Sequence, residues 1–365
     1  MCGCGGIGRR AGFKIRFPRK CRFESDHPHH FQSACEFAAP FFCRGKELKP
    51  DHLTEEEKAK YAAFLFEQYK RLVTLGADEK PVGFPPLHHY TTGDSLIKII
   101  QSGELWATQV SCLNDSKEVT HAVELLENTI TKRAKITSDK NFGKLLSLMQ
   151  SQLKCTEVST FGCFIVSFSS NEDDLSQWRA YGGSNGGYSL RFNSESMLQY
   201  LAMQGDYLAP VTYSEAIKSK LMEEIVTSLE GFLTEGLSDR ASSSSEEWII
   251  EFTQHILAQL SYLAPLMKHR SFERENEWRL IHYLKTEDSS RMTFSERGGM
   301  LRRHIPIKLS PQLHDGYTRL PLSGIMVGPQ THKEISKISV GDLLGSRGYI
   351  DTQVPVLLSD VPYRT

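Results

Sequence analysis

The sequence predicts an α+β fold in which strands that lie far apart in the chain share one sheet around a central helical insertion. Short apolar strand patterns occur on both sides of a long helical region, first in a strand–helix–strand unit at 87–110 and again from Lys268 onward. Between them, residues 215–237 and 246–267 have the spacing of two amphipathic helices. We therefore predict a single catalytic-type domain over residues 54–365, with the helical insertion at about 215–268.

The first ordered element is predicted to be a helix that begins with a capping box. Thr54 precedes Glu57 by three residues, and apolar residues then recur at helical spacing until Gly76. After it the sequence predicts a strand at 87–91, a helix that Asp94 or Ser95 caps and Gly103 ends, and a strand at 105–110. Helices from Asn114 and from Phe142 to Leu153 follow, then a strand at 161–168, a helical turn opened by Asp173 and Asp174, and strands at 187–192 and 211–213. After the two long helices, the sequence predicts strands at 278–284, 301–308 and 325–327, a helix from Thr331 towards Gly345, and a last strand at 354–357.

The composition excludes several classes of protein. Of the 365 residues, 39% are hydrophobic and 24% charged, which is typical of a globular protein. No apolar run is long enough to cross a bilayer. The formal net charge of −1 provides no overall field that would attract nucleic acid or an anionic membrane. We expect a cytoplasmic protein with no membrane partner.

The N-terminal segment, residues 1–53, differs from the rest of the chain. Its first 46 residues hold nine Lys or Arg against three acidic residues, together with five of the eight cysteines. A zinc site is conceivable with the nearby histidines, but the cysteine spacing is not that of a zinc finger. We therefore expect a basic, flexible arm whose cysteines are reduced, and no bound metal.

Two carboxylates mark the stretch most suggestive of chemistry. Glu275 and Glu277 lie two residues apart at the start of the predicted strand 278–284, so both are expected to face one space. Acids are placed together either at a surface, where water screens them, or at a site that needs an acid, a base or a cation stabiliser. The surface alternative is a solvated strand end, with Arg274 and Arg279 as ion-pair partners.

Several motifs together carry a resemblance to a known family. They are HYTT-x-x-SL-x-x-I-x-x-x-G-x-LW at 89–106, LND-x-x-E at 113–118, SFS-x-x-x-DDLSQWRAYG at 167–182, GGYSLRF at 186–192, F-x-x-E-x-EWRL at 272–280, VGP at 327–329 and PYR at 362–364. In this order they resemble the family catalogued as domain of unknown function 2971. The strand with His-Tyr-Thr and the helix that follows it are also similar to the first segment of the diphtheria-toxin-like and DarT-like ADP-ribosyltransferases.

The second resemblance implies a split mixed sheet of ADP-ribosyltransferase type, with NAD as substrate. It implies a catalytic glutamate on a late strand, and we assign Glu277 to this role with Glu275 as its helper. A fixed carboxylate there would stabilise the positive charge that develops on the ribose as the nicotinamide bond breaks. The resemblance also implies that the histidine of the first strand, His89, contacts NAD, and we expect further contacts from aromatic rings and from arginines that neutralise the pyrophosphate. The expected cofactor-binding residues are His89, Tyr90, Thr91, Trp178, Arg179, Tyr181, Arg279 and Arg364.

Each assignment has a structural alternative. His89 is expected to face the site while His88, on the opposite face of the strand, is structural; alternatively His89 is itself a core histidine. Trp178 and Tyr181 are spaced as core packing residues as well as a ligand platform. Asn114 and Asp115, with Glu118, fit a helix cap.

The leading hypothesis is an NAD-consuming ADP-ribosyltransferase or NAD glycohydrolase that modifies a macromolecule, either nucleic acid or protein, or hydrolyses NAD. A bacterial toxin or an antiviral defence effector would have this activity. The first alternative is a metal-dependent nucleic-acid-processing enzyme in which Asp115, Glu118, Glu275 and Glu277 hold a divalent cation. The second is a non-catalytic module that senses a nucleotide in the same pocket.

Overall fold

The computed structural model describes residues 52–74, 83–113, 117–155, 162–184, 186–238, 240, 245–285, 288, 290–310, 318–350 and 352–362. The predicted basic arm therefore lies outside the described residues, apart from its last two positions. The predicted helix cap at Asn114 and Asp115, and Arg364, also lie outside them.

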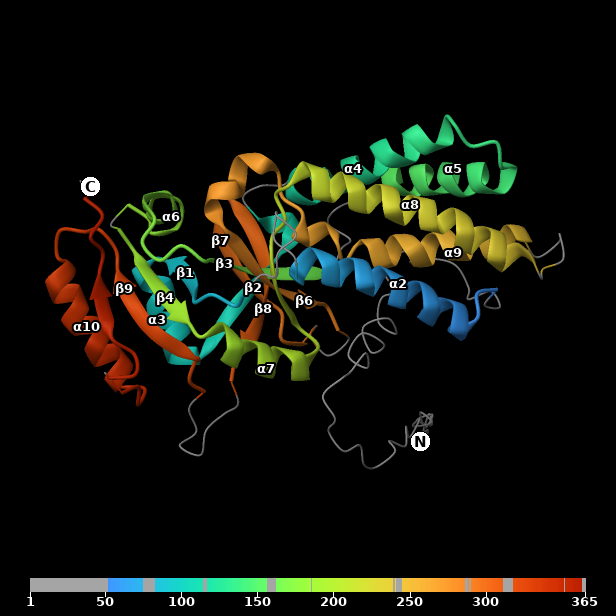
Figure 1. Ribbon diagram of the computed structural model, residues 1–365. Coiled ribbons are helices and arrows are strands. Elements are labelled where there is room, and N and C mark those ends of the chain that lie inside the picture. The colour runs from blue at the N-terminus through green and yellow to red at the C-terminus, as the bar shows by residue number, and fades with distance from the viewer. Residues whose placement is uncertain are drawn as a thin grey trace, which may run out of the picture.

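The predicted mixed sheet is confirmed, and within the described residues it has ten strands at the centre of the molecule (Figure 1). Its main path runs in the order β10-β9-β4-β1-β3-β2-β8-β7, while β6 joins β3 and β5 joins β6. The pair β9 and β10 is parallel and the other pairs are antiparallel. The strands are β1 (Leu87–Thr91), β2 (Glu104–Gln109), β3 (Cys163–Ser169), β4 (Tyr188–Phe192), β5 (Tyr207–Pro210), β6 (Glu277–Tyr283), β7 (Thr293–Arg297), β8 (Met300–Lys308), β9 (Leu322–Val327) and β10 (Val356–Leu358).

The sheet forks at β3. One edge of β3 pairs with β6 along its whole length. On the other edge, the start of β3 pairs with β2, where Ile165 lies opposite Thr108, and its end pairs with β1, where Ser169 lies opposite His88. Among the described strands, residues 166–168 pair with β6 alone. Two arms of the sheet, one led by β1 and one by β2, therefore diverge from the middle of β3.

Helices cover both faces of this sheet. Three of them, α3, α7 and α10, bury residues such as Ile100, Met197 and Leu344 against one face. Five helices, α2, α4, α5, α8 and α9, form a bundle whose apolar core continues onto Ile165 and Ile281 of the opposite face. Figure 1 shows the bundle extending from one end of the sheet, with α10 and β9 at the other end. The helices are α2 (Glu55–Thr74), α3 (Gly93–Ser102), α4 (Lys117–Ala134), α5 (Lys140–Cys155), α6 (Leu175–Tyr181), α7 (Ser194–Gln204), α8 (Glu215–Ser238), α9 (Ser245–Leu260) and α10 (Lys333–Gly345), with short 3₁₀ turns η1 (Val110–Cys112), η3 (Ala264–Leu266) and η4 (Arg270–Glu275).

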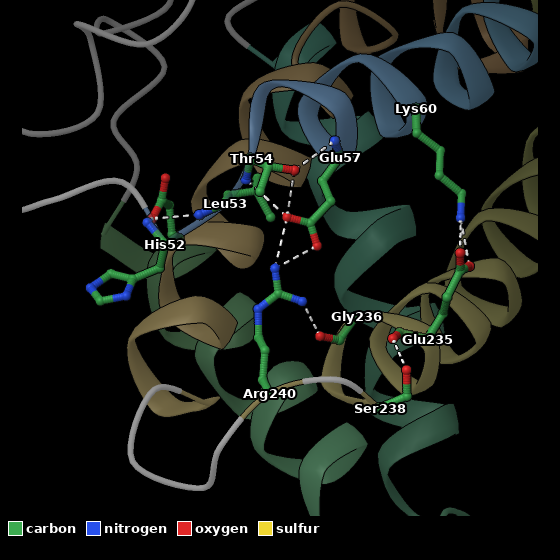
Figure 2. Close-up of polar contacts among 10 residues, drawn as sticks. His52, Leu53, Thr54, Glu57, Lys60, Glu235, Gly236, Ser238 and Arg240 are labelled. Carbon is green, nitrogen blue, oxygen red and sulfur yellow. Dashed lines mark hydrogen bonds and ion pairs between the residues drawn. The ribbon is translucent and has the colours of Figure 1, made fainter.

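The capping box predicted for the first helix is confirmed (Figure 2). The Glu57 backbone N–H donates to Thr54 Oγ1 at 3.2 Å, and the Thr54 N–H donates to Glu57 Oε2 at 2.8 Å. The same carboxylate accepts from Arg240 Nη2 at 2.8 Å, just beyond the end of α8. Lys60, one turn further along α2, pairs with Glu235. The start of α2 is therefore fixed both by its own cap and by the end of α8.

Some predicted boundaries are wrong for local physical reasons. Helix α3 begins two or three residues earlier than predicted, because Thr92 and not Asp94 or Ser95 is its N-cap, with Thr92 Oγ1 accepting from the Ser95 N–H. The predicted stop at Gly103 is confirmed, since its φ of 68° is left-handed and an added Cβ would lie 2.1 Å from the Thr318 carbonyl oxygen.

Helix α7 and strand β7 were not predicted. The predicted strand at 211–213 is displaced to β5, and Thr212 forms only an isolated bridge with Met267. Helix α9 ends at Leu260 rather than at 267, and the 3₁₀ turn η3, which contains Pro265, follows it. This irregular segment leads directly to Lys268.

Candidate active site

A cavity of about 1910 Å³ opens at the fork of the sheet. Its walls come from β1, α3, β2, the middle of β3, α6, η4, the start of β6 and the hairpin of β7 and β8. Residues 165–169, where the two arms diverge, border it. Both predicted glutamates also border it.

Glu275 and Glu277 do meet in space, but not for the predicted reason. Only Glu277 is in a strand; Glu275 is the last residue of η4, and Asn276 between them has a left-handed φ of 43°. The alternation of a strand therefore does not bring them together. Instead, Lys268 Nζ donates to Glu275 Oε2 at 2.7 Å and to Glu277 Oε2 at 2.9 Å.

Glu277 is a buried carboxylate held by two cations. Arg279 donates to it through Nε at 2.8 Å and through Nη2 at 3.0 Å, in addition to the bond from Lys268. Burial would raise the pKa of Glu277, but the charges of Arg279 and Lys268 outweigh it and lower that pKa to about 2. The alternative of a solvated strand end is wrong for Glu277, since the residue is 5% exposed.

Arg279 is committed to this structure. Its side chain is 1% exposed, and Nη1 donates to the Pro265 carbonyl at 2.8 Å while the other two nitrogens bind Glu277. All three ends of the guanidinium are therefore engaged, which disfavours the predicted role of Arg279 on a pyrophosphate.

Glu275 has a different environment. Its side chain is 25% exposed, against 6% for Glu277, and it borders the cavity. The ammonium of Lys268, which binds Glu275, also lies 4.7 Å from the centre of the Phe272 ring in a cation–π contact. Glu275 is thus the carboxylate of the pair that a ligand in the cavity can reach.

The pairing of the strands decides which histidine stands with the acids. His88 lies opposite Ser169, and Ser169 lies opposite Glu277. Residues opposite one another in adjacent strands project from the same face. His88 therefore projects from the same face of the sheet as Glu277. The prediction that His88 points away from the site is wrong.

His89 projects from the other face but also borders the cavity. Its ring packs edge-to-face on Phe168 at 5.8 Å, and Nδ1 lies 3.0 Å from the Ser167 carbonyl oxygen. A carbonyl can only accept, so Nδ1 carries the proton and Nε2 is the acceptor. Burial lowers the pKa of His89, which keeps the ring neutral.

The predicted aromatic platform is divided between packing and the cavity. Trp178 is 1% exposed, packs edge-to-face on Tyr90 at 4.6 Å and donates from Nε1 to Asp173 at 2.7 Å. The Tyr90 hydroxyl donates to the Asn171 carbonyl at 2.7 Å. Trp178 is therefore a core residue outside the cavity wall, whereas Tyr90 borders the cavity from a packed position.

The other predicted ligand-binding residues lie in several places. Thr91 and Tyr181 border the cavity. Arg179 is exposed on α6 and lies outside the cavity wall. Arg364 lies outside the described residues.

Two lysines were missed by the sequence analysis. Lys218 of α8 is fully buried, and its Nζ donates to the Lys268 carbonyl at 2.8 Å, to Glu215 at 2.7 Å and to His121 Nε2 at 2.9 Å. Lys218 thereby fixes the backbone of Lys268, whose own Nζ binds both glutamates. Two neighbouring carboxylates require a cation nearby, and this requirement could have pointed to Lys268. No sequence signal relates Lys218 to Lys268, which lies 50 positions away.

The metal alternative depends partly on residues that the structure does not describe. Across the described ranges, no group of three or more His, Cys, Asp or Glu side chains is arranged to hold a metal ion. Asp115 and the side chain of Glu118, two members of the predicted ligand set, lie outside those ranges. In the same described part of the chain, no helix is long and apolar enough to cross a membrane.

Residues 177–280 match the family model described as "Protein of unknown function (DUF2971)". The match confirms the first of the two resemblances over this stretch, which runs from α6 into β6 and contains Lys218, Lys268, Glu275, Glu277 and Arg279. No curated protein and no solved structure matches the chain.

Proposed function

We propose that this protein is an NAD-consuming enzyme of ADP-ribosyltransferase type, which cleaves the bond between nicotinamide and ribose. The ADP-ribose passes to a macromolecule, nucleic acid or protein, or to water. The observation that supports this proposal is the position of Glu275: a partly exposed carboxylate, fixed by Lys268, at a large cavity in the fork of a mixed sheet. Consumption of NAD fits a cytoplasmic toxin or defence effector.

The chemistry requires a negative charge beside the reacting sugar. As the nicotinamide leaves, positive charge develops at the anomeric carbon, and a preorganised carboxylate lowers the energy of that state. We assign this role to Glu275, which reverses the order expected from the sequence. Glu277 is neutralised by two cations and buried, so its contribution is to hold Lys268 and Arg279 in place.

The cavity has the size and the polar groups for a dinucleotide. Pockets for small ligands measure roughly 300–1,000 Å³, so about 1910 Å³ leaves space for NAD together with part of an acceptor. His89 presents Nε2 as an acceptor for a ribose hydroxyl, and Tyr181 offers an aromatic ring. Lys98 and Arg297 also border the cavity and supply positive charge for the pyrophosphate in place of Arg279.

Replacing Glu275 by Gln is expected to lower kcat for nicotinamide release by about 10²–10³-fold, the usual effect of removing one electrostatic stabiliser. Since the side chain is partly exposed, the free energy of unfolding should fall by no more than about 1 kcal/mol. Release is measured by chromatography and stability by urea unfolding. Glu273→Gln, at a neighbouring carboxylate 58% exposed, is the matched control and should retain full activity. Full activity in the Glu275→Gln variant would show that Glu275 takes no part in the reaction.

One observation favours a second candidate function, a nucleotide-sensing module. Lys268 engages both glutamates, and Arg279 further compensates Glu277, so the cavity could bind a nucleotide without turning it over. A rise in melting temperature with NAD, without nicotinamide release, would select this candidate.

A further inference from the structure

A second cluster of reactive side chains borders the same cavity at the β7–β8 hairpin. Ser295 Oγ lies 2.6 Å from His304 Nε2, and His304 Nδ1 lies 3.1 Å from Thr108 Oγ1. All three residues border the cavity, and His304 is 7% exposed. A hydroxyl, an imidazole and a third group that orients the imidazole are the components of an activated nucleophile.

The sheet register holds these groups together. His304 of β8 lies directly opposite Thr108 of β2 and also opposite Thr293 of β7. Ser295 follows Thr293 by two residues, so it projects from the same face and reaches His304 diagonally. The three side chains come from three adjacent strands, which gives them a rigid support.

This cluster is separate from the Glu275 site. Four strand intervals lie between β6 and β7, through β3, β2 and β8, which amounts to roughly 19 Å at the usual strand spacing. Ser295 is thus separated from the strand that follows Glu275 by β3, β2 and β8, and we assign it no part in the chemistry at Glu275. The inference goes beyond the proposed function and does not depend on it.

We propose that Ser295 is a nucleophilic serine, activated by His304, that attacks the carbonyl carbon of a carboxylic ester bound in this part of the cavity. A bond forms between Ser295 Oγ and the carbonyl carbon while the Oγ proton passes to His304 Nε2. The ester C–O bond then breaks, and the alcohol leaves with that proton. Water, deprotonated by His304 in turn, hydrolyses the acyl-serine to a carboxylic acid and regenerates the hydroxyl.

The surroundings fit this substrate class. Arg302 lies opposite Ser295 in the hairpin and borders the cavity, so its positive charge favours the oxyanion of the tetrahedral intermediate. Trp106 is 42% exposed, with its ring 5.5 Å from that of His304, and offers an apolar surface for the acyl group. Burial, with the charge of Arg302, lowers the pKa of His304, so the ring is an unprotonated base at neutral pH.

The test is reaction of the full chain with an alkyl fluorophosphonate, followed by mass-spectrometric mapping of the labelled residue. We expect one label per chain on Ser295, none there in Ser295→Ala, and labelling about a hundredfold slower in His304→Gln. Ser339→Ala, at an exposed hydroxyl on α10 that donates to the Ile335 carbonyl, is the control and should leave the label unchanged. Circular dichroism melting checks that each variant is folded.

The dependence of the labelling rate on pH separates activation from a structural hydrogen bond. With His304 as base, the labelling rate should rise with pH to a plateau. The midpoint of this rise should lie below the ordinary imidazole pKa of 6.5. Thr108→Val, which removes the group on Nδ1, should shift this midpoint while the fold is retained. A Ser295 label that forms no faster than one on Ser339, or at the same rate in folded His304→Gln, would overturn the proposal.

Discussion

The Glu277→Gln variant is expected to lose about 3–5 kcal/mol of unfolding free energy, the usual result of removing one partner from a buried ion pair. Arg279, whose side chain is 1% exposed, would then face a neutral amide in place of the carboxylate that it binds through Nε and Nη2. Lys268 would lose one of the two glutamates to which it donates. Both cations are buried, with exposed fractions of 1% for Arg279 and 4% for Lys268, so water would compensate them poorly. Urea unfolding at pH 7 measures the loss.

The same site predicts how stability changes with pH. The folded-state pKa of Glu277, about 2, lies below the ordinary value of 4.5, so its contribution is complete above pH 4.5 and is lost as the pH falls towards 2. The difference between wild type and Glu277→Gln should therefore shrink on acidification. Equal unfolding midpoints for the two proteins at pH 7 would show that Glu277 does not anchor the site.

Replacing His282 by Gln is expected to have a comparable effect, about 3–5 kcal/mol, at the other end of β6. His282 is buried between two carboxylates, with Nδ1 2.7 Å from Asp206 and Nε2 2.8 Å from Asp288. Because both nitrogens face acceptors, the ring is an imidazolium that donates twice. Its removal would leave two buried acids, 1% and 0% exposed, without the cation between them.

The shifted pKa values give the pH range in which the contact of His282 with Asp206 and Asp288 stabilises the fold. Hydrogen bonds and charges of the two carboxylates raise the pKa of His282 despite its burial, so its contribution is complete below pH 6.5 and is lost as the pH rises through the higher folded value. The pKa of Asp288 is lowered, so its contribution is complete above pH 3.8. The difference in unfolding free energy between wild type and His282→Gln should be largest between pH 3.8 and 6.5.

A matched histidine provides the control for this measurement. Burial lowers the pKa of His255 to about 4. The difference in unfolding free energy between wild type and His255→Gln should therefore not decline as the pH rises above 6.5. If the His282→Gln difference did not decline at alkaline pH, the imidazolium reading of His282 would be wrong.

Local chemistry made part of this fold predictable. The Thr54–Glu57 box and the Gly103 stop depend on groups within a few residues of one another, and both are confirmed. The mixed sheet and the long helices of the insertion followed from apolar periodicity. Of the edge strands, β7 was missed and β5 was placed four residues too late, since the stability of such strands comes from the strands beside them.

The site was only partly predictable because its contacts are long-range. The parity of a strand shows that His88 and His89 face opposite sides, but only the pairing of β1 with β3 shows which one shares the face of Glu277. The proximity of the two glutamates was predicted from strand alternation, yet it arises from Lys268 and a left-handed turn at Asn276. The sequence therefore could not show which of Glu275 and Glu277 is accessible from the cavity and which is buried in ion pairs.

The measurement that tests the central claim most directly is nicotinamide release by the full wild-type chain incubated with NAD in excess chelator. We predict that nicotinamide and ADP-ribose products appear at a rate that the chelator does not change, because Glu275 and not a metal stabilises the developing charge. Activity that the chelator abolishes would instead favour the metal-dependent alternative. The absence of nicotinamide release with any nucleic-acid or protein acceptor, together with no rise in melting temperature on adding NAD, would contradict the account.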